Sequence, residues 1–255
     1  MRFLVIGDVC EDVYHFGVSN RKNPESAAPL ISTSRSISSS GMAANVARNL
    51  EALGAKVDTL FPPKPWSEKH RYIDAKLHQQ LLRVDYDRTA SPLDRVPDLE
   101  PYDAVVVSDY NKGFIDFDFL EALDGSIPVF LDTKKRELGF LKDTWVKINE
   151  HEYHQLITEP TNLIVTMAEK GSSWGDIRAL SQQIDLVDPC GAGDTYLAAF
   201  AWSMIKSSGN TVHAMRFANQ AAAITCLYRG TYAPKLEEIY RCYRRNYLRV
   251  ARGLP

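Results

Sequence analysis

A short glycine-rich stretch, "DPCGAGDTY" at residues 188–196, contains the residue types best suited to chemistry in this chain. Gly-Ala-Gly at the start of a helix leaves backbone N–H groups open to a phosphate-like anion. An aspartate held beside them, here Asp194, can take the proton of a hydroxyl while its oxygen attacks phosphorus. The spacing alone fits an ordinary helix N-cap equally well, because short glycine motifs are common. The stretch therefore predicts either a phosphoryl-transfer site or a simple helix start.

Length and charge limit the possible folds and partners. The chain has 255 residues, 45% of them hydrophobic, so we expect one domain with one large core over residues 1–255. A net charge of -2, from 30 basic and 32 acidic residues, provides no overall attraction to nucleic acid or to an anionic membrane. We therefore expect small-molecule partners, bound locally, and neither nucleic acid nor a membrane.

Cysteine use and the N-terminus predict a cytoplasmic protein. The four cysteines form no C-x-x-C pair and no zinc-site spacing; they are Cys10, Cys190, Cys226 and Cys242. The opening "MRFLVIGDVCEDVY" has one basic residue and a short apolar run, too little for a secretory signal or a membrane span. We expect reduced thiols and a cytoplasmic location.

Apolar runs that alternate with helical stretches predict an α/β fold. Strands are expected where short apolar runs end in polar residues, at 2–6, 102–110, 128–133 and 162–167. Helices are expected at 41–54, 193–209 and 211–228. This order predicts a mainly parallel sheet. Ligands of such sheets lie beyond the carboxyl ends of the strands, the positions of Asp8, Asp109, Asp132 and Thr166.

Two polar segments, approximately 13–40 and 69–88, are expected to stand away from this core. The first is Ser-rich and weakly periodic, whereas the second alternates better and is able to pair with it as a small sheet. The proline-rich "FPPKPW" at 61–66 predicts a connector rather than a helix or strand. These segments predict a β lid.

Three ordered motifs resemble those of the ribokinase-like (phosphofructokinase B, PfkB) family of carbohydrate kinases. They are "SGMAANVARNLEALGAKV", "KINEHEY" and "DPCGAGDTYLAAF", and the resemblance runs from Phe3 to about Leu236. It implies a three-layer sandwich with a mainly parallel sheet and a small β lid. Relatives with such a lid often dimerise through it, and the alternation in "LHQQLLRVDYD" fits a homodimer. "VVVSDYNKGFID" and similar segments resemble the branch that phosphorylates O1 of a heptose 7-phosphate on the route to ADP-heptose.

The resemblance implies a role for each residue of the glycine-rich motif. Asp194 would be the catalytic base, and the anion hole for the phosphoryl group of ATP would be formed by Gly191, Ala192 and Gly193. Asp188 would help to hold a metal, in particular a monovalent cation such as K⁺, although capping of the turn explains it equally well.

The resemblance also places the nucleotide and its metal. Asn149 and Glu152 would position Mg²⁺ and the nucleotide phosphates, since Mg²⁺ takes few direct carboxylates. The nucleotide base would lie near Asn219 and Gly230. Ala222 and Ala223 either admit the adenine or simply pack between helices.

For the phosphoryl acceptor, the resemblance points to Asp12, Gly41 and Asn45 as ligands of sugar hydroxyls. A helix-face polar residue is the alternative for Asn45. A sugar phosphate also needs basic side chains at its distal group, and each candidate is weak because most lone basic residues are solvated. The candidates are Arg21, Lys22, Arg71 and Lys112.

The chain departs from the family pattern at four places. Met42 and Ala168 stand where the family has glycine, and Pro189-Cys190 replaces a pair of hydroxyl residues. Between residues 61 and 69 the family has a strand, a helix and a further strand, and here only the connector remains. These departures keep two alternatives open: a non-catalytic sugar- or nucleotide-binding relative, and a kinase of another acceptor such as a ketose or a nucleoside. The basic C-terminal "YRCYRRNYLRVARG" is explained by a helix dipole without nucleic acid.

Overall fold

The computed structural model describes residues 1–242 and contains a central sheet of eight strands. In spatial order the strands are β12 (Ile177–Ala179), β11 (Ser172–Trp174), β10 (Asn162–Thr166), β9 (Trp145–Asn149), β8 (Val129–Thr133), β7 (Ala104–Asp109), β1 (Arg2–Gly7) and β4 (Lys56–Leu60). The pairings from β10 to β4 are parallel, and β11 and β12 add an antiparallel edge. The expected α/β fold with a mainly parallel sheet is therefore confirmed.

Helices connect these strands. They are α1 (Ala43–Ala52), α2 (Phe117–Leu123), α3 (Glu150–Tyr153), α4 (Ala192–Lys206) and α5 (Thr211–Thr225), with one turn of 3-10 helix, η1 (Ala168–Lys170). The first helix was expected from Gly41 and begins two residues later. Gly41 and Met42 still pair with Cys10 and Val9 as strand residues.

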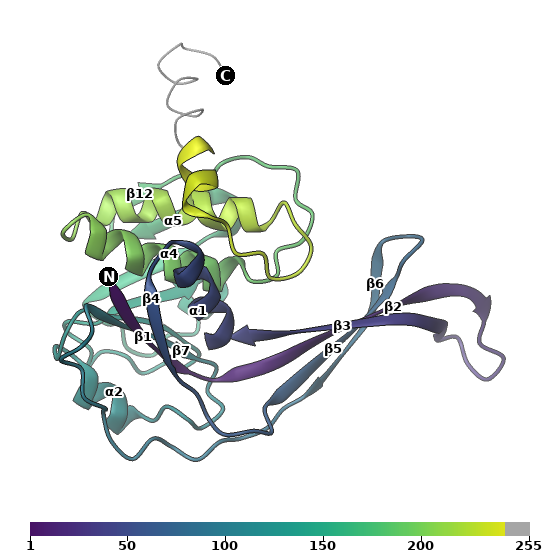
Figure 1. Cartoon of the computed structure of the whole chain (residues 1–255), viewed down its shortest axis with the longest axis horizontal. Helices are drawn as coiled ribbons and strands as arrows, with labels where there is room; N and C mark the ends of the chain where they lie inside the picture. The colour runs from purple at the N-terminus through teal and green to yellow at the C-terminus, as the bar shows by residue number, and fades with distance from the viewer. Residues whose placement is uncertain (243–255) are drawn as a thin grey trace, which may run out of the picture.

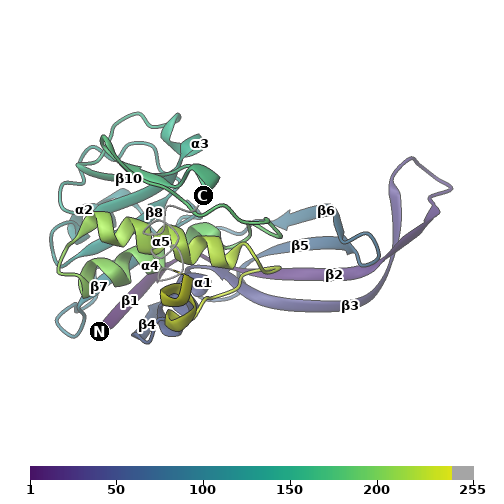
Figure 2. The same ribbon diagram turned by 90° about the horizontal axis from the view of Figure 1, so that it is seen from above.

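Alternation along β1 explains how the sheet is covered on both faces. Phe3 and Val5 pack in one apolar core with residues of α1, α4 and α5. Leu4 and Ile6 pack in a second core with residues of α2. Successive residues of a strand point to opposite faces, so both faces are buried and the body has three layers (Figures 1 and 2).

A second, four-stranded sheet projects from this body (Figures 1 and 2). Its strands, in spatial order, are β3 (Pro29–Met42), β2 (Val9–Lys22), β5 (Ser67–Asp74) and β6 (Gln79–Tyr86). Two antiparallel hairpins, β2–β3 and β5–β6, join through parallel pairing of β2 with β5. This sheet, called the lid below, contains the expected segments 13–40 and 69–88 apart from their turns and ends.

Four strands of the central sheet were not expected from the sequence. They are β4, β9, β11 and β12, which are short or carry polar residues. In β9, "WVKIN", Lys147 is buried in the sheet because it pairs with a carboxylate. Apolar patterning misses such a strand, since ion pairing rather than hydrophobicity accounts for its burial.

Two of the departures from the family pattern keep a backbone conformation that favours glycine. Met42 has φ 58° and Ala168 has φ 48°, both in the left-handed region. A side chain in this region costs about 1–2 kcal/mol. Both positions therefore have a backbone conformation that glycine would adopt without this cost.

Three further findings concern the chain ends and the thiols. In the part of the chain that the structure describes, no helix has the length and apolar character to cross a membrane. Cys10, Cys190, Cys226 and Cys242 are free thiols. Most of the basic C-terminal segment, residues 243–253, lies outside the described residues.

Candidate active site

The glycine-rich turn before α4 holds Asp194 in the first turn of that helix, with 6% of its surface exposed. Gly191 is the N-cap residue and has φ 80°, a left-handed conformation that glycine adopts without cost. A Cβ at Gly191 would also lie 2.9 Å from the amide nitrogen of Asn45. The Ala192 N–H donates to the Pro189 carbonyl at 3.2 Å, so one of the three expected anion-hole groups is used within the turn.

Two side chains donate hydrogen bonds to the Asp194 carboxylate. Asn45 Nδ2 donates to Oδ2 at 2.9 Å, and the Tyr110 hydroxyl donates to Oδ1 at 3.2 Å. The Asn45 amide is oriented by Arg48, which donates to Asn45 Oδ1 at 2.9 Å. Because that oxygen faces a guanidinium, the NH₂ group must face Asp194. Asn45, predicted as a ligand of sugar hydroxyls, thus lies against Asp194, the predicted base, whereas Tyr110 and Arg48 were missed.

Burial raises the pKa of Asp194 to about 6, and the nearby Asp132 carboxylate acts in the same direction. The hydrogen bonds from Asn45 and Tyr110 and the charge of Lys147 oppose this increase in pKa. A carboxylate with such a pKa is still largely ionised at neutral pH and is a better proton acceptor than an ordinary aspartate. Asp194 is therefore suited to act as a general base.

Two cavities meet at this turn. Gly191 and Asp194 line a cavity of about 340 Å³ beneath the lid. Ala192 and Gly193 line another, of about 250 Å³, between α4, α5 and the strand end at Thr166. Pro189 lines both. The turn that holds Asp194 is therefore the wall between two binding spaces.

Of the three predicted acceptor residues, only Asp12 lines the cavity beneath the lid; Gly41 and Asn45 do not. Asp12 forms a buried ion pair with Arg71 of β5. A Cβ on Gly41 would collide with the Asp12 carboxylate, which explains why glycine is needed there. Met42, 3% exposed, also lines this cavity and fills space that a glycine would leave open.

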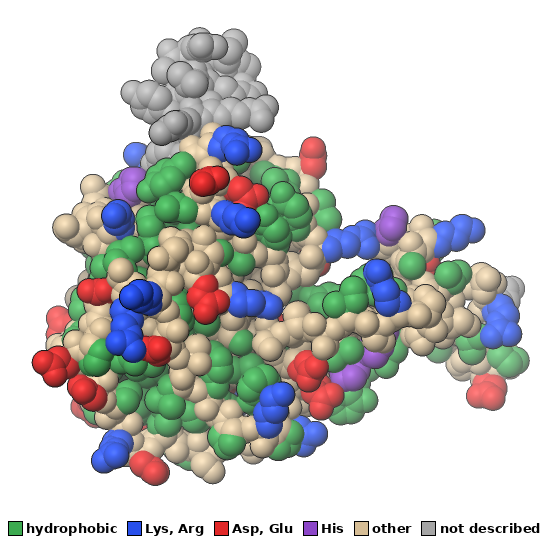
Figure 3. Space-filling view, in the orientation of Figure 1, with side chains coloured by type: hydrophobic (Ala, Val, Ile, Leu, Met, Phe, Trp, Pro, Cys, Tyr) green, Lys and Arg blue, Asp and Glu red, His purple; other side chains and the backbone are tan. Residues whose placement is uncertain are grey.

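Three basic side chains of the lid line the same cavity: Lys69, Arg71 and Arg83. Lys69 and Arg71 alternate on β5, and Arg83 of β6 stands directly opposite Arg71. Figure 3 shows further Lys and Arg side chains on the projecting lid. Lys69 and Arg83 were missed, although the alternation of "KHR" puts Lys69 on the same face as Arg71.

Of the other predicted basic candidates, neither Arg21 nor Lys112 lies at this cavity. Arg21 is exposed near the far end of β2. Lys112 pairs with Asp87 at 2.7 Å and lines a different cavity. The side chain of Lys22 lies outside the described part of the chain.

Two lysines lie behind the glycine-rich turn and were not predicted. Lys147 Nζ pairs with Asp132 Oδ2 at 2.6 Å and would be 3.1 Å from a Cβ at Gly193. Lys134 pairs with Glu152 and lies 5.1 Å from the centre of the Tyr110 ring. Their ammonium groups supply positive charge where Gly193 exposes its backbone. The signal was present in "KINEHEY", where Lys147 precedes Asn149 by two positions on one strand.

Asn149 and Glu152 form the capping box of α3. The Asn149 side chain accepts from the Glu152 N–H at 2.9 Å, and Glu152 accepts from the Asn149 N–H at 2.9 Å. One Glu152 oxygen also faces Lys134. Asp132 Oδ1 is buried without a hydrogen-bond partner, so it provides an oxygen acceptor for a cation near Glu152. No group of three His, Cys, Asp or Glu residues arranged around a metal position occurs within residues 1–242.

Asp188 binds backbone groups. Its two oxygens accept from the N–H groups of Cys190 and Gly230, each at 2.9 Å. Asp188 therefore joins the glycine-rich turn to the loop after α5. Gly230 lies beside Tyr14 of the lid and is not among the residues around the second cavity.

The second cavity contains the remaining predicted nucleotide residues. Asn219, Ala222 and Ala223 line it from α5, together with Thr166. The Asn219 side chain is buried and donates to the Ala179 carbonyl at 2.7 Å, so it fixes the edge of the sheet against the helix. Ala168 lines the same cavity.

Comparison with known proteins places these residues in a family. The description "pfkB family carbohydrate kinase" matches residues 143–239, a range that contains Lys147, Glu152, Asp194 and Asn219. A putative ribokinase from Agrobacterium tumefaciens superposes with a TM-score of 0.74 over 97% of this chain and 99% of that chain. At 18% identity, this likeness shows the fold.

Two curated relatives match nearly the whole chain. D-beta-D-heptose 7-phosphate kinase of Bordetella bronchiseptica is 30% identical over 292 residues, covering 90% of this chain and 92% of that protein. The bifunctional protein HldE of Nitratiruptor is 28% identical over 300 residues, covering 93% of this chain but only 64% of the relative. The chain thus spans less than two thirds of that bifunctional relative. With this similarity, this fold and a buried aspartate between two cavities, the chain belongs to the pfkB family of carbohydrate kinases.

Proposed function

We propose that this kinase transfers the γ-phosphoryl group of ATP to a phosphorylated sugar, with O1 of a heptose 7-phosphate as the acceptor hydroxyl. The observation that carries the proposal is the shared wall: the turn with Asp194 separates the cavity beneath the lid from the cavity beside α5. A donor and an acceptor held in these two spaces would meet at the aspartate. Phosphoryl transfer depends mainly on such positioning and on charge neutralisation.

In the proposed reaction, Asp194 takes the proton of the acceptor hydroxyl as that oxygen bonds to the γ-phosphorus and the bond to the ADP oxygen breaks. Asn45 and Tyr110 hold the carboxylate in place through their hydrogen bonds. The open backbone at Gly193 and the ammonium group of Lys147 would stabilise the negative charge of the phosphoryl group.

The donor set fits ATP with Mg²⁺. Asp132 Oδ1, which has no hydrogen-bond partner and lies 3.9 Å from Lys134 Nζ, and Glu152 would hold the metal near the nucleotide phosphates. When bound, Mg²⁺ would neutralise phosphate charge. The alanines of α5 leave room for a flat base beside Asn219. A need for a monovalent cation such as K⁺ stays a prediction, because both Asp188 oxygens already accept backbone N–H groups.

The three basic side chains of the lid, Lys69, Arg71 and Arg83, support the proposal that the acceptor already carries a phosphate group. Arg71 and Arg83 pair with Asp12 and Asp85, and Lys69 lies 5.2 Å from the centre of the Tyr110 ring. Sugar hydroxyls bound by Asp12 would leave Arg71 available to the distal phosphate. Charge-assisted contacts of this kind are stronger than neutral ones.

A second candidate function is supported by one observation. Met42 occupies part of the acceptor cavity, so a smaller acceptor, such as a ketose or a nucleoside, or binding without turnover, is the alternative. The acceptor assay below separates these possibilities.

The outer face of the lid supports a homodimer. His15 stacks on Tyr72 with ring centres 4.6 Å apart, and it exchanges a 2.9 Å hydrogen bond with His70. Leu82 and Tyr86 of the lid are each 54% exposed. An apolar and aromatic sheet face of this kind is suited to pairing with a second copy.

The kinase proposal predicts ADP production from ATP with a phosphorylated sugar. Asp194→Asn is expected to lower kcat by about 10²–10⁴-fold, because the general base is lost. Asp176→Asn, on an exposed turn, is the matched control and should leave kcat unchanged. The assay covers heptose, hexose and pentose phosphates, a ketose and a nucleoside. Background ADP production with every acceptor, unchanged in Asp194→Asn, would contradict the proposal.

The raised pKa of Asp194 predicts an acidic limb in the pH profile. Since the ionised carboxylate is the active form, kcat/KM should rise as pH increases and reach half its plateau near pH 6. Asn45→Ala removes a hydrogen bond that favours the ionised form, so its limb should move to higher pH. Tyr110→Phe should move it in the same direction by less. An identical limb in all three proteins would show that Asp194 is not the titrating base.

The lid cations predict selective loss of phosphorylated acceptors. Lys69→Ala and Arg83→Ala should each raise the KM for the sugar phosphate about tenfold or more, because a charge-assisted contact contributes about 1.5–3 kcal/mol. The KM for ATP should stay the same. Arg21→Ala, exposed near the end of β2, serves as the control and should change neither KM. Equal effects of all three substitutions would argue against a phosphate site on the lid.

The proposed dimer predicts a molecular mass twice that of the chain in sedimentation velocity. Tyr86→Asp should convert the dimer to a monomer, because it places a charge on the apolar lid face. A monomeric mass for the unaltered chain at micromolar concentration would contradict the lid interface.

A further inference from the structure

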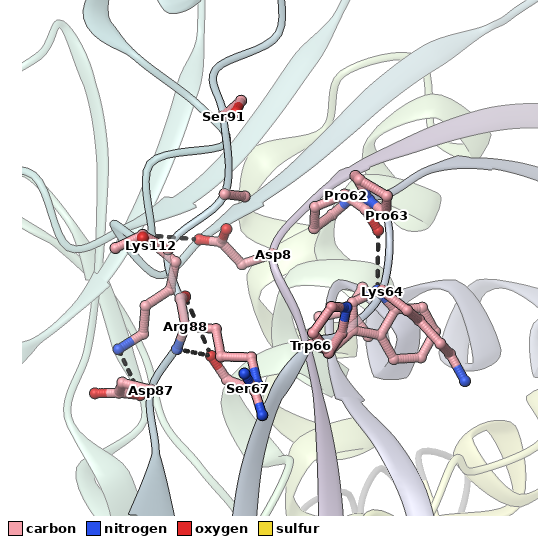
Figure 4. A pocket seen from close by; sticks show the side chains of 14 residues that line it. Asp8, Pro62, Pro63, Lys64, Trp66, Ser67, Asp87, Arg88, Ser91 and Lys112 are labelled. Carbon is pink, nitrogen blue, oxygen red and sulfur yellow. Dashed lines mark hydrogen bonds and ion pairs between the residues drawn. The ribbon is translucent and has the colours of Figure 1, made fainter.

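A third cavity, of about 580 Å³, lies at the base of the lid. The connector with Pro62 and Trp66 forms one wall, the segment 87–91 forms another, and Asp8 and Lys112 complete it (Figure 4). It shares no lining residue with the two cavities that meet at Asp194. We propose that this cavity is a second ligand site, which takes a small polyhydroxylated anion of the sugar phosphate class.

Asp8 provides the polar centre of this site. It is 2% exposed, and its Oδ2 accepts from the N–H groups of Tyr110 at 2.8 Å and Lys112 at 3.3 Å. Its Oδ1 is buried without any hydrogen-bond partner. In Figure 4 the carboxylate lies between Lys112 and the Pro62–Pro63 wall. A buried acceptor without a partner is costly, and a hydroxyl of a bound molecule would satisfy it.

Basic side chains at the rim favour an anion. Lys64 Nζ lies 4.6 Å from the centre of the Trp66 ring, and no ion pair of Lys64 occurs within the described residues. Arg88 is exposed, and its ion pair with Glu68 is weak because the nitrogen and oxygen atoms are 3.9 Å apart. Lys112, by contrast, is neutralised by Asp87 at 2.7 Å. Lys64 and Arg88 are therefore the two cations available to a phosphate group.

The opposite wall suits the carbon face of a sugar. Pro62, Pro63 and Trp66 supply apolar surface, and Trp66 is held in place because its Nε1 donates to the Pro62 carbonyl at 2.9 Å. Hydroxyls of Ser67 and Ser91 also line the cavity. An apolar wall with a few convergent polar groups is the usual composition of a small-molecule site.

The connector that builds this wall belongs to the part of the chain that is shortened. The alignment with the Nitratiruptor relative extends over 300 positions, more than the 255 residues of this chain, so the relative has segments that are absent here. The connector passes directly from β4 to the lid. In this chain the connector therefore forms one wall of the cavity.

One chain of contacts links the cavity to the base. Asp8 holds the Tyr110 backbone N–H, and the Tyr110 hydroxyl donates to Asp194 at 3.2 Å. A ligand that bonds to Asp8 therefore acts on the residue that positions Asp194. The site itself does not depend on the proposed function; only this coupling does.

Calorimetric titration of the full chain with glucose 6-phosphate tests the site. All the variants are made in a protein that already carries Lys69→Ala and Arg83→Ala, called the background, because these two substitutions weaken anion binding beneath the lid. This background should still bind one equivalent of the probe. Adding Lys64→Ala/Arg88→Ala should weaken that binding about tenfold or more, since two charge-assisted contacts are lost. Adding Arg178→Ala/Lys206→Ala, two exposed positions away from all three cavities, should not change it.

Two further probes test the ligand class. Glucose and inorganic phosphate should each bind about tenfold or more weakly than glucose 6-phosphate, because each makes only part of the contacts. A crystal structure with glucose 6-phosphate should place the phosphate at Lys64 and Arg88 and a hydroxyl at Asp8. The proposal is overturned if the background binds no probe, if the Lys64/Arg88 pair has no effect, or if phosphate alone binds equally well. Binding is measured without turnover, so an inactive kinase would leave this result interpretable.

Discussion

The hydrogen bond from Asn45 to Asp194 connects the two halves of the active site. It joins α1, which follows the first lid hairpin, to the start of α4, 149 residues later in the chain. Arg48 orients the Asn45 amide and also donates to Thr231, so the loop after α5 is held by the same contacts. This buried polar contact holds Asp194 in place. It thereby also fixes the turn that separates the two cavities.

Ionisation of Asp194 is balanced between burial and hydrogen bonding. Burial favours the neutral carboxyl group, whereas Asn45, Tyr110 and Lys147 favour the carboxylate. The balance leaves a carboxylate with a pKa of about 6, a value suited to accepting a hydroxyl proton. The backbone N–H group of the same Tyr110 donates to Asp8, which lines the third cavity.

The two faces of the lid sheet carry different kinds of side chain. Asp12, Lys69 and Arg71 point into the acceptor cavity, and their neighbours His15, His70 and Tyr72 form the aromatic outer face. This division follows from the two-residue period of a strand. Residues two positions apart therefore share a face of the sheet, and adjacent residues do not.

The sequence by itself determined the α/β class, the lid segments and the motif that contains Asp194, because apolar periodicity and glycine-rich turns are local signals. It did not pair Asn45 with the aspartate, because it assigned Asn45 to the sugar hydroxyls. Only the tertiary structure decided which basic residues face the acceptor cavity. Strand register brings Arg83 opposite Arg71 and leaves Arg21 exposed near the end of β2, and no local pattern encodes that pairing.

Local sequence patterns also do not encode the burial of Lys147, the hydrogen bonds of Asp188 or the third cavity. Lys147 is buried because Asp132 on the neighbouring strand neutralises it. Asp188 accepts from the N–H group of Cys190 in its own turn and from that of Gly230, which is distant in sequence. The cavity at Asp8 exists only where the proline-rich connector folds against residues 87–91 and Lys112. Contacts between distant segments set each of these features, since charge pairing and hydrogen bonding depend on distances that only the folded chain defines.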